Sequence, residues 1–130
     1  MKKTIQILSI VCFFLAIGIC SQAQGYCNNS NRYATCNSYG AGNAGGDWLL
    51  TSPTGNAQLV VDLNTYDQLG DAIADVGSSN GEIQAMYNIW GFYQHDGTNV
   101  YLNVTPGDVT IYISIYASPY AQAHASVILF

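Results

Sequence analysis

DVTIYISIYA, residues 108–117, alternates aliphatic side chains with side chains that mostly carry hydroxyl groups. The aliphatic positions are Val109, Ile111, Ile113 and Ile115. A period of two is typical of a β-strand that buries one face and leaves the other to water. The stretch therefore predicts a half-buried strand in a β-rich domain.

The preceding residues repeat this pattern. Residues 99–104 alternate in the same way, and residues 105–108 between the two stretches have the composition of a turn. Pairing the stretches through this turn places both aliphatic sets on one face and brings Tyr101 beside Tyr112. The sequence thus predicts an antiparallel hairpin.

Two more strands complete a predicted four-stranded meander. Asp96-Gly97 is a strong hairpin signal and would join residues 82–93 to the strand at 99–104. Residues 82–93 also fit a helical period, so both interpretations remain open. Residues 123–130 are nearly all apolar at their end and predict a last strand, buried inside the sheet or paired with another element.

The segment before the meander predicts a second layer. Residues 47–52 and 57–63 have the pattern of two strands. Residues 65–76 carry apolar side chains at three- and four-residue spacing and are followed by Gly77, which predicts a short helix. The expected fold is α+β and mostly β, an antiparallel meander or sandwich of about six strands with one short helix.

The chain divides into three predicted parts. Residues 1–23 have a basic start, an apolar core and small residues before Gln24, the pattern of a bacterial-type secretory signal peptide. Residues 24–46 are rich in Asn, Gly, Ser and Tyr and predict a flexible arm. Residues 47–130 form the predicted folded domain. We therefore expect a protein that is secreted or held at the cell surface, with no membrane span once the signal peptide is removed.

Charge excludes two classes of partner. Of the three basic residues only Arg32 lies beyond the leader, while all eight acidic residues do, which gives a net charge of −7 for residues 24–130. A chain with one cation cannot neutralise a phosphate backbone, so nucleic acid is excluded. An anionic membrane surface is excluded for the same reason.

The two cysteines beyond the leader, Cys27 and Cys36, predict a disulfide that closes a short loop, because an even number in an exported chain is typical of such a bond. Two cysteines without a nearby histidine do not make a metal site. Asp67, Asp71 and Asp75 recur every four residues and predict a solvated acidic helix face, without a calcium-loop motif.

No catalytic signature is present. The sequence lacks a Gly-x-Ser-x-Gly motif, a His-x-x-x-His pair and a phosphate-binding glycine loop. The two histidines are expected in a turn, for His95, and at the start of the last strand, for His124. Eight acidic residues leave a glycosidase-type carboxylate pair open, but no spacing singles out two. We expect no enzyme, cofactor or metal.

Five aromatic residues are predicted to share the meander face opposite the aliphatic one. They are Trp90, Phe92, Tyr101, Tyr112 and Tyr116. Either the second layer covers this face, or part of it is exposed, where rings among Asn and Tyr side chains suit sugar stacking or protein contact. The leading hypothesis is a non-enzymatic secreted protein that self-assembles into an extracellular fibre, matrix or surface layer. The alternative is a small carbohydrate-binding module that holds an extracellular glycan.

Overall fold

The computed structural model describes residues 25–40 and 42–130, and the predicted signal peptide lies outside them. These residues form nine strands and no helix. The strands are β1 (Tyr26–Asn29), β2 (Tyr33–Tyr39), β3 (Gly42–Ser52), β4 (Asn56–Thr65), β5 (Gly70–Ser78), β6 (Gln84–Gly91), β7 (His95–Asn103), β8 (Gly107–Ala117) and β9 (Ala121–Leu129). No helix in this part of the chain has the length and apolar character needed to cross a bilayer.

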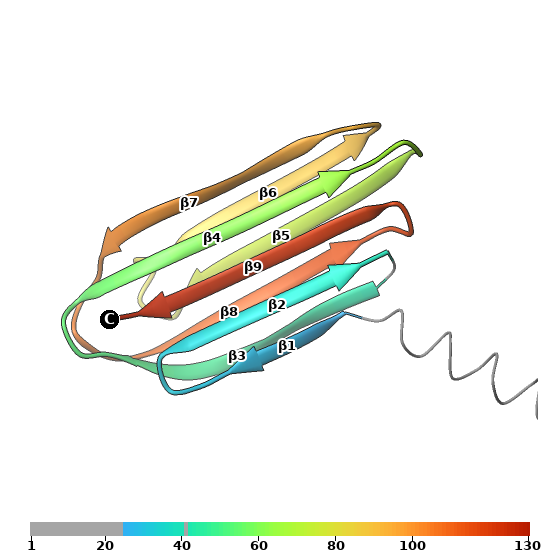
Figure 1. The fold of residues 1–130 in the computed structure, drawn as a ribbon. Coiled ribbons are helices and arrows are strands. Elements are labelled where there is room, and N and C mark those ends of the chain that lie inside the picture. The colour runs from blue at the N-terminus through green and yellow to red at the C-terminus, as the bar shows by residue number, and fades with distance from the viewer. Residues whose placement is uncertain (1–24, 41) are drawn as a thin grey trace, which may run out of the picture.

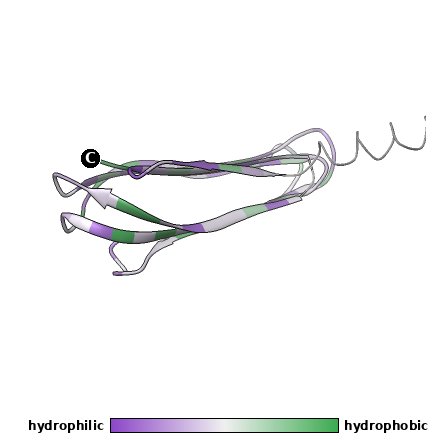
Figure 2. Cartoon of the chain, turned by 90° about the horizontal axis from the view of Figure 1, so that it is seen from below, coloured by the Kyte–Doolittle hydropathy of each residue, from purple (hydrophilic) through white to green (hydrophobic). Residues whose placement is uncertain are grey.

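Two antiparallel sheets pack face to face as a sandwich (Figures 1 and 2). Sheet A has the strand order β1-β2-β9-β4-β7, and sheet B has the order β3-β8-β5-β6. Their outer surfaces are called here the A face and the B face. The mostly β, antiparallel class expected from the sequence is confirmed, with nine strands in place of about six.

The predicted meander is wrong, because consecutive strands change sheet. β7 lies at the edge of sheet A beside β4, whereas β8 lies inside sheet B between β3 and β5. The turn at residues 105–108 therefore connects a strand of one sheet to a strand of the other, and does not join two paired strands as in a hairpin. The aliphatic sides of both strands still meet the same core, from opposite sheets, so the alternation fits either arrangement and does not distinguish them.

Asp96-Gly97 is not a turn. Both residues lie within β7, where Gly97 is opposite Asp62 of β4. A side chain at Gly97 would collide with the carbonyl oxygen of Val61, so this glycine permits close strand approach. The chain reverses earlier, at Tyr93, which has a φ of 50°. The helical alternative for residues 82–93 is also wrong, since they contain β6.

The predicted helix at residues 65–76 is replaced by a bend and strand β5. Ala72, Ala74 and Val76 are buried while Ile73 between them is exposed, which is a period of two. The helical spacing was misleading because Ile73 and Leu69 point into solvent. Alanine and glycine in β5 gave little apolar signal for the true inward face.

The predicted flexible arm at residues 24–46 differs from the structure. From residue 25 it contains β1, β2 and the first part of β3, apart from residue 41. Ala34, Cys36 and Ser38 of β2 point inward and are fully buried. These small side chains alternate with outward residues, but they are too weakly apolar to mark a strand in the sequence. The arm and the domain share one core.

The core is aliphatic and is filled from both sheets. Ile111, Ile113 and Ile115 of β8 face it from sheet B, and the predicted buried last strand is confirmed as β9 inside sheet A. Ser52 Oγ donates a hydrogen bond to the carbonyl of Phe130 over 2.9 Å. Among the described residues no buried side-chain polar atom lacks a partner. Cohesion therefore comes from apolar burial and hydrogen bonds, with little contribution from ion pairs.

Candidate functional site

The five aromatic residues do not form one surface. Trp90, Tyr112 and Tyr116 lie on the B face, whereas Tyr101 lies on the A face. Phe92 follows β6 in the connection to β7 and is exposed. The separation results from the placement of β7 and β8 in different sheets. Trp90 is 72% exposed and Tyr101 74%, so neither is covered by a second layer.

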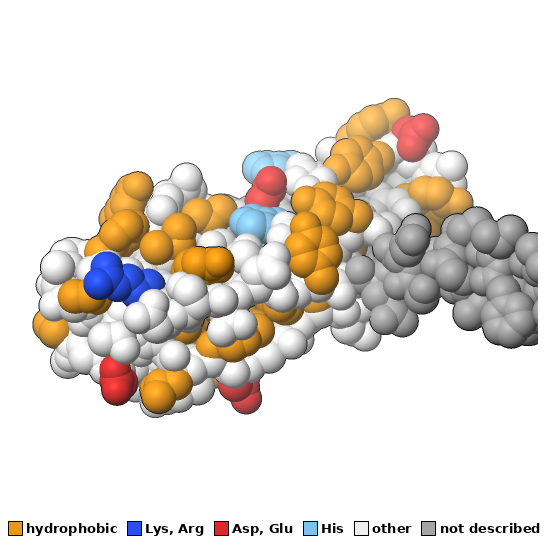
Figure 3. Space-filling model, turned by 60° about the horizontal axis from the view of Figure 1, so that its bottom comes forward, with side chains coloured by type: hydrophobic (Ala, Val, Ile, Leu, Met, Phe, Trp, Pro, Cys, Tyr) orange, Lys and Arg blue, Asp and Glu red, His pale blue; other side chains and the backbone are white. Residues whose placement is uncertain are grey.

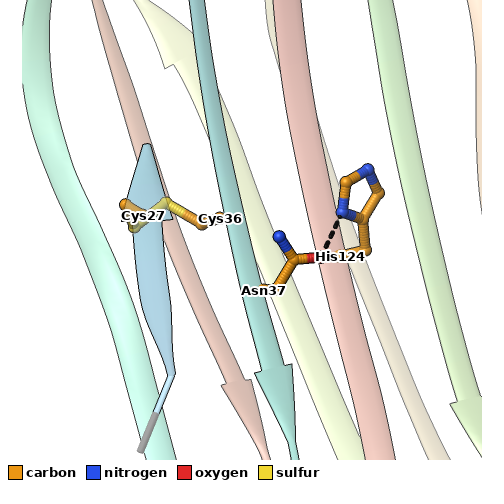
Figure 4. Close-up of a disulfide and its surroundings, with 4 residues drawn as sticks. All are labelled: Cys27, Cys36, Asn37 and His124. Atoms are coloured by element: carbon orange, nitrogen blue, oxygen red, sulfur yellow. Dashed lines mark hydrogen bonds between the residues drawn. A yellow bond between two sulfur atoms is a disulfide. The ribbon is translucent and has the colours of Figure 1, made fainter. Parts of the chain in front are cut away.

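A row of polar side chains crosses the centre of the A face. Asn37 of β2, His124 of β9 and Asp62 of β4 are successive cross-strand neighbours. His124 Nδ1 lies 2.7 Å from Asn37 Oδ1, close to the disulfide that joins β1 to β2 (Figure 4). The strand pairing thus brings together residues that are far apart in sequence.

His95 joins this row from the edge strand. Its Nε2 lies 3.0 Å from Asp62 Oδ1, and Asn64 Nδ2 donates to the same oxygen over 2.9 Å. This is the only ion pair in the part of the chain that the structure describes, and it forms when the histidine is protonated. Figure 3 shows both histidines next to an acidic side chain, with hydrophobic side chains on either side. Asp62 is held in place but remains accessible from solvent.

The electrostatics of the row are set by Asp62 and two imidazoles. Burial lowers the pKa of His124, and the Asp62 carboxylate opposes part of this shift. At neutral pH the neutral form of the His124 imidazole is therefore favoured, and each ring nitrogen donates or accepts a hydrogen bond according to the tautomer. The Asp62 carboxylate is the one acidic group of the row, and its negative charge disfavours anionic ligands.

A hollow of about 390 Å³ lies beside this row, between β4 and β7. Gly97, which carries no side chain, lies in its lining between His95 and Asn99. Its wall also contains Asp62 and Val60. Gln58 Nε2 donates to Asn99 Oδ1 over 2.9 Å, so the amide at this end is also fixed in orientation.

Tyrosine rings flank the polar row on both sides along the strands. Tyr101 follows Asn99 on the same face of β7, and its ring centroid lies 6.5 Å from that of Phe130. On the other side are Tyr39 and Tyr66, both about half exposed. Tyr66 donates its hydroxyl hydrogen to Gln122 Oε1 over 2.6 Å. The A face therefore combines aromatic surface with oriented amide, carboxylate and imidazole groups.

The B face has a different character. Its exposed large side chains include Leu49, Ile73, Met86 and Trp90. Tyr112 covers the backbone at Gly77, where an added Cβ would collide with the tyrosine ring. This ring therefore has a structural role across two strands of sheet B and is only partly available to a ligand.

Sequence reasoning missed the central residues of the A face. The sequence places His95 in a turn and His124 at the start of the last strand and relates neither to Asp62, because only the register of three strands brings them together. Each of the three residues occupies an outward position in the alternation of its own strand, and this was the only signal available. Which strands pair with one another was not deducible from the sequence. Within the described residues no cluster of three or more His, Cys, Asp or Glu side chains is arranged to hold a metal ion. Asp71 and Asp75, expected on a helix, lie instead on the B face of β5.

Comparisons with known proteins give distant structural similarity only. No protein-family model and no curated protein matches the sequence. The structure of TmCBM61 in complex with beta-1,4-galactotriose is 12% identical to this chain, with a TM-score of 0.36. The similarity covers 77% of this chain and 65% of TmCBM61, so this chain spans less than two thirds of the length of TmCBM61. A family 35 carbohydrate binding module from Clostridium thermocellum is 8% identical with a TM-score of 0.37, over 79% and 76% of the two chains. The infectious bursal disease virus Gx strain structure is 12% identical with a TM-score of 0.35, over 79% and 34%. These values assign no family, and the function proposed below rests on the side chains of this chain.

Proposed function

We propose that this protein is a non-catalytic, extracellular glycan-binding protein that holds an uncharged sugar chain on the A face. The observation that carries the proposal is the hollow between His95 and Asn99, with the Asp62–His95 pair in its wall and the Tyr101 ring next to it along β7. The disulfide between Cys27 and Cys36 supports a location in an oxidising compartment.

The aromatic part of the site suits the apolar face of a sugar ring. Tyr101 is 74% exposed, and its tilted contact with Phe130 restricts the ring before a ligand arrives. A ring that is already ordered loses little entropy on stacking, which favours binding. Tyr39 and Tyr66 offer a second aromatic surface across the polar row, suited to a further unit of an extended chain.

The polar part suits hydroxyl groups. Asp62 accepts hydrogen bonds, Asn99 both donates and accepts, and each imidazole presents one donor or acceptor according to its tautomer. Asp62 and Asn99 already have protein partners, which hold their side chains in one orientation. A few oriented polar groups beside apolar surface are typical of small-ligand sites.

Charge narrows the class of glycan. Asp62 is central to the row, and Arg32, the only Lys or Arg of residues 25–130, lies in the turn between β1 and β2. The polar row itself contains no Lys or Arg side chain to pair with a uronic acid or sulfate group. We expect neutral glycans to bind and acidic polysaccharides to be rejected at neutral pH.

A glycan array followed by calorimetry tests the proposal. We expect binding to a subset of neutral glycans and at least tenfold weaker binding by the Tyr101→Ala and Asp62→Asn variants, about 1.4 kcal/mol each. The matched control is Trp90→Ala, which removes an equally exposed ring from the B face and is expected to leave glycan affinity unchanged. Absence of glycan binding, or full affinity in the Tyr101→Ala variant, would overturn the proposal.

Self-assembly into a fibre or layer is the second candidate function, and the edge strands β6 and β7, which pair with a neighbour on one side only, favour it. Light scattering on the purified protein tests it directly. Large regular particles that persist when glycan binding is abolished would make assembly the primary function. A monomer would remove this candidate.

A further inference from the structure

We propose that the B face is a docking surface for a cationic segment of another protein, with an Arg or Lys side chain of that partner seated beside Trp90. The inference concerns the sheet opposite the proposed glycan site and does not depend on that site. It assigns a role to the exposed apolar and acidic side chains of β5 and β6, which glycan binding on the A face leaves unused.

Carboxylates and large apolar side chains alternate across β5 and β6. Trp90 is the cross-strand partner of Asp71, and Met86 is the partner of Asp75. Ile73 lies between the two acids on the same face of β5 and is 42% exposed. Each carboxylate thus has an exposed hydrophobic neighbour within one strand spacing.

A small hollow lies at the Trp90 end of this arrangement. It has a volume of about 190 Å³ and is lined by Asp71, Ile73, Asn88, Ile89 and Trp90. The space suits one long side chain lying along the indole ring with its charged head near the Asp71 carboxylate. A guanidinium or ammonium group there gains a cation–π contact and an ion pair at once.

Charge argues for a cationic partner. In the described residues the one ion pair is on the A face, so Asp71 and Asp75 have no ion-pair partner among those residues. Asp47 on β3 adds a third acid to the B face, opposite Tyr112 of β8. Apolar surface supplies contact area, and the unpaired acids select a basic sequence over a neutral or acidic one.

A second copy of the chain does not fit this surface. A symmetric dimer whose two-fold axis passes through the exposed surface of β5 would place Asp71 and Asp75 of one copy close to the same acids of the other. Arg32 cannot relieve the repulsion, because it lies in the β1–β2 turn of sheet A. Sugar is also a poorer match, because Met86 and Leu49 give this face aliphatic side chains where the A face has oriented amides.

Fluorescence anisotropy with labelled synthetic peptides tests the proposal. The probes are Arg-Leu-Arg-Leu-Arg-Leu and its counterpart with glutamate in place of arginine. We expect the basic peptide to bind and the acidic peptide to fail. Affinity should fall at least tenfold in Trp90→Ala and about fivefold in Asp71→Asn, and it should weaken as salt rises. Tyr101→Ala is the matched control and should bind the peptide normally.

Four outcomes would overturn the proposal: no binding of the basic peptide, equal binding of the acidic peptide, unchanged affinity in Trp90→Ala, or loss of peptide binding in Tyr101→Ala. Dimers in light scattering that Trp90→Ala abolishes would assign the surface to a second copy. Glycan binding that Trp90→Ala abolishes would assign it to sugar. Because Trp90 and Asp71 are surface residues, circular dichroism and the melting temperature serve to show that both variants are folded.

Discussion

Reduction of the Cys27–Cys36 disulfide is expected to lower the free energy of unfolding by about 2.6 kcal/mol. The bond joins cysteines nine positions apart and ties edge strand β1 to β2. Closing a loop of about nine residues restricts the unfolded chain by about 2.6 kcal/mol at 25 °C on the chain-entropy relation. For a domain of about 100 residues this corresponds to a fall of about 10 °C in the melting temperature.

Urea denaturation of the oxidised and reduced protein measures this difference. The Cys27→Ala variant is the matched control: its stability should equal that of the reduced protein within about 0.5 kcal/mol, because Cys36 keeps its buried thiol in both. The slope of unfolding free energy against urea should stay nearly constant. A difference below 1 kcal/mol between the oxidised and reduced forms would refute the loop-closure reasoning and indicate that β1 contributes little to the folded state.

Three further substitutions, two of them with a matched control substitution, test the fold and its pH dependence. In urea denaturation, Gly97→Ala should lower the free energy of unfolding by about 2 kcal/mol, because the added Cβ would collide with the backbone of β4. The control Gly81→Ala should lower it by about 1 kcal/mol, because the added Cβ has open space there and only the φ of 76° is unfavourable. Ile113→Ala should lower the free energy of unfolding by about 3 kcal/mol, because it leaves a cavity in the core. In the control Ser114→Ala, at the exposed neighbouring position, the free energy of unfolding should change by no more than about 0.5 kcal/mol. Burial lowers the pKa of folded His124, so stability should fall as pH drops below its unfolded value of about 6.5, and His124→Gln should flatten that slope.

Strand positions were predictable where apolar residues alternate, and their partners were not. Residues 108–117 lie wholly in β8 and residues 57–63 wholly in β4, as the period of two indicated. The alternation identifies the core side of a strand but is the same in either sheet. Short turns favoured pairing between consecutive strands, whereas β7 and β8 lie in different sheets. Small inward residues such as Ala72 and Ala34 hid two further strands.

The candidate site was predictable only in part, for the same reason. The sequence predicts Trp90 and Tyr101 on the sheet face opposite the aliphatic one and leaves open whether a second layer covers them; in the structure both are exposed. The prediction that they share one surface is wrong, because it depended on hairpins that the structure does not contain. Asp62, His95 and His124 come from β4, β7 and β9, and no local pattern relates three strands separated by whole elements of the chain.

The strand order has a consequence for folding kinetics. Of the seven pairings in the described chain, only β1–β2 and β5–β6 join strands that are consecutive in sequence. The other five require distant segments to meet before they gain any contact, which typically places all-β domains in the millisecond-to-second range. The β1–β2 hairpin is local, so its disulfide is able to form while the rest of the sandwich is still unfolded. The hairpin therefore needs no distant segment in order to form, and it offers β9, the last strand of the chain, a prepared edge on which to pair.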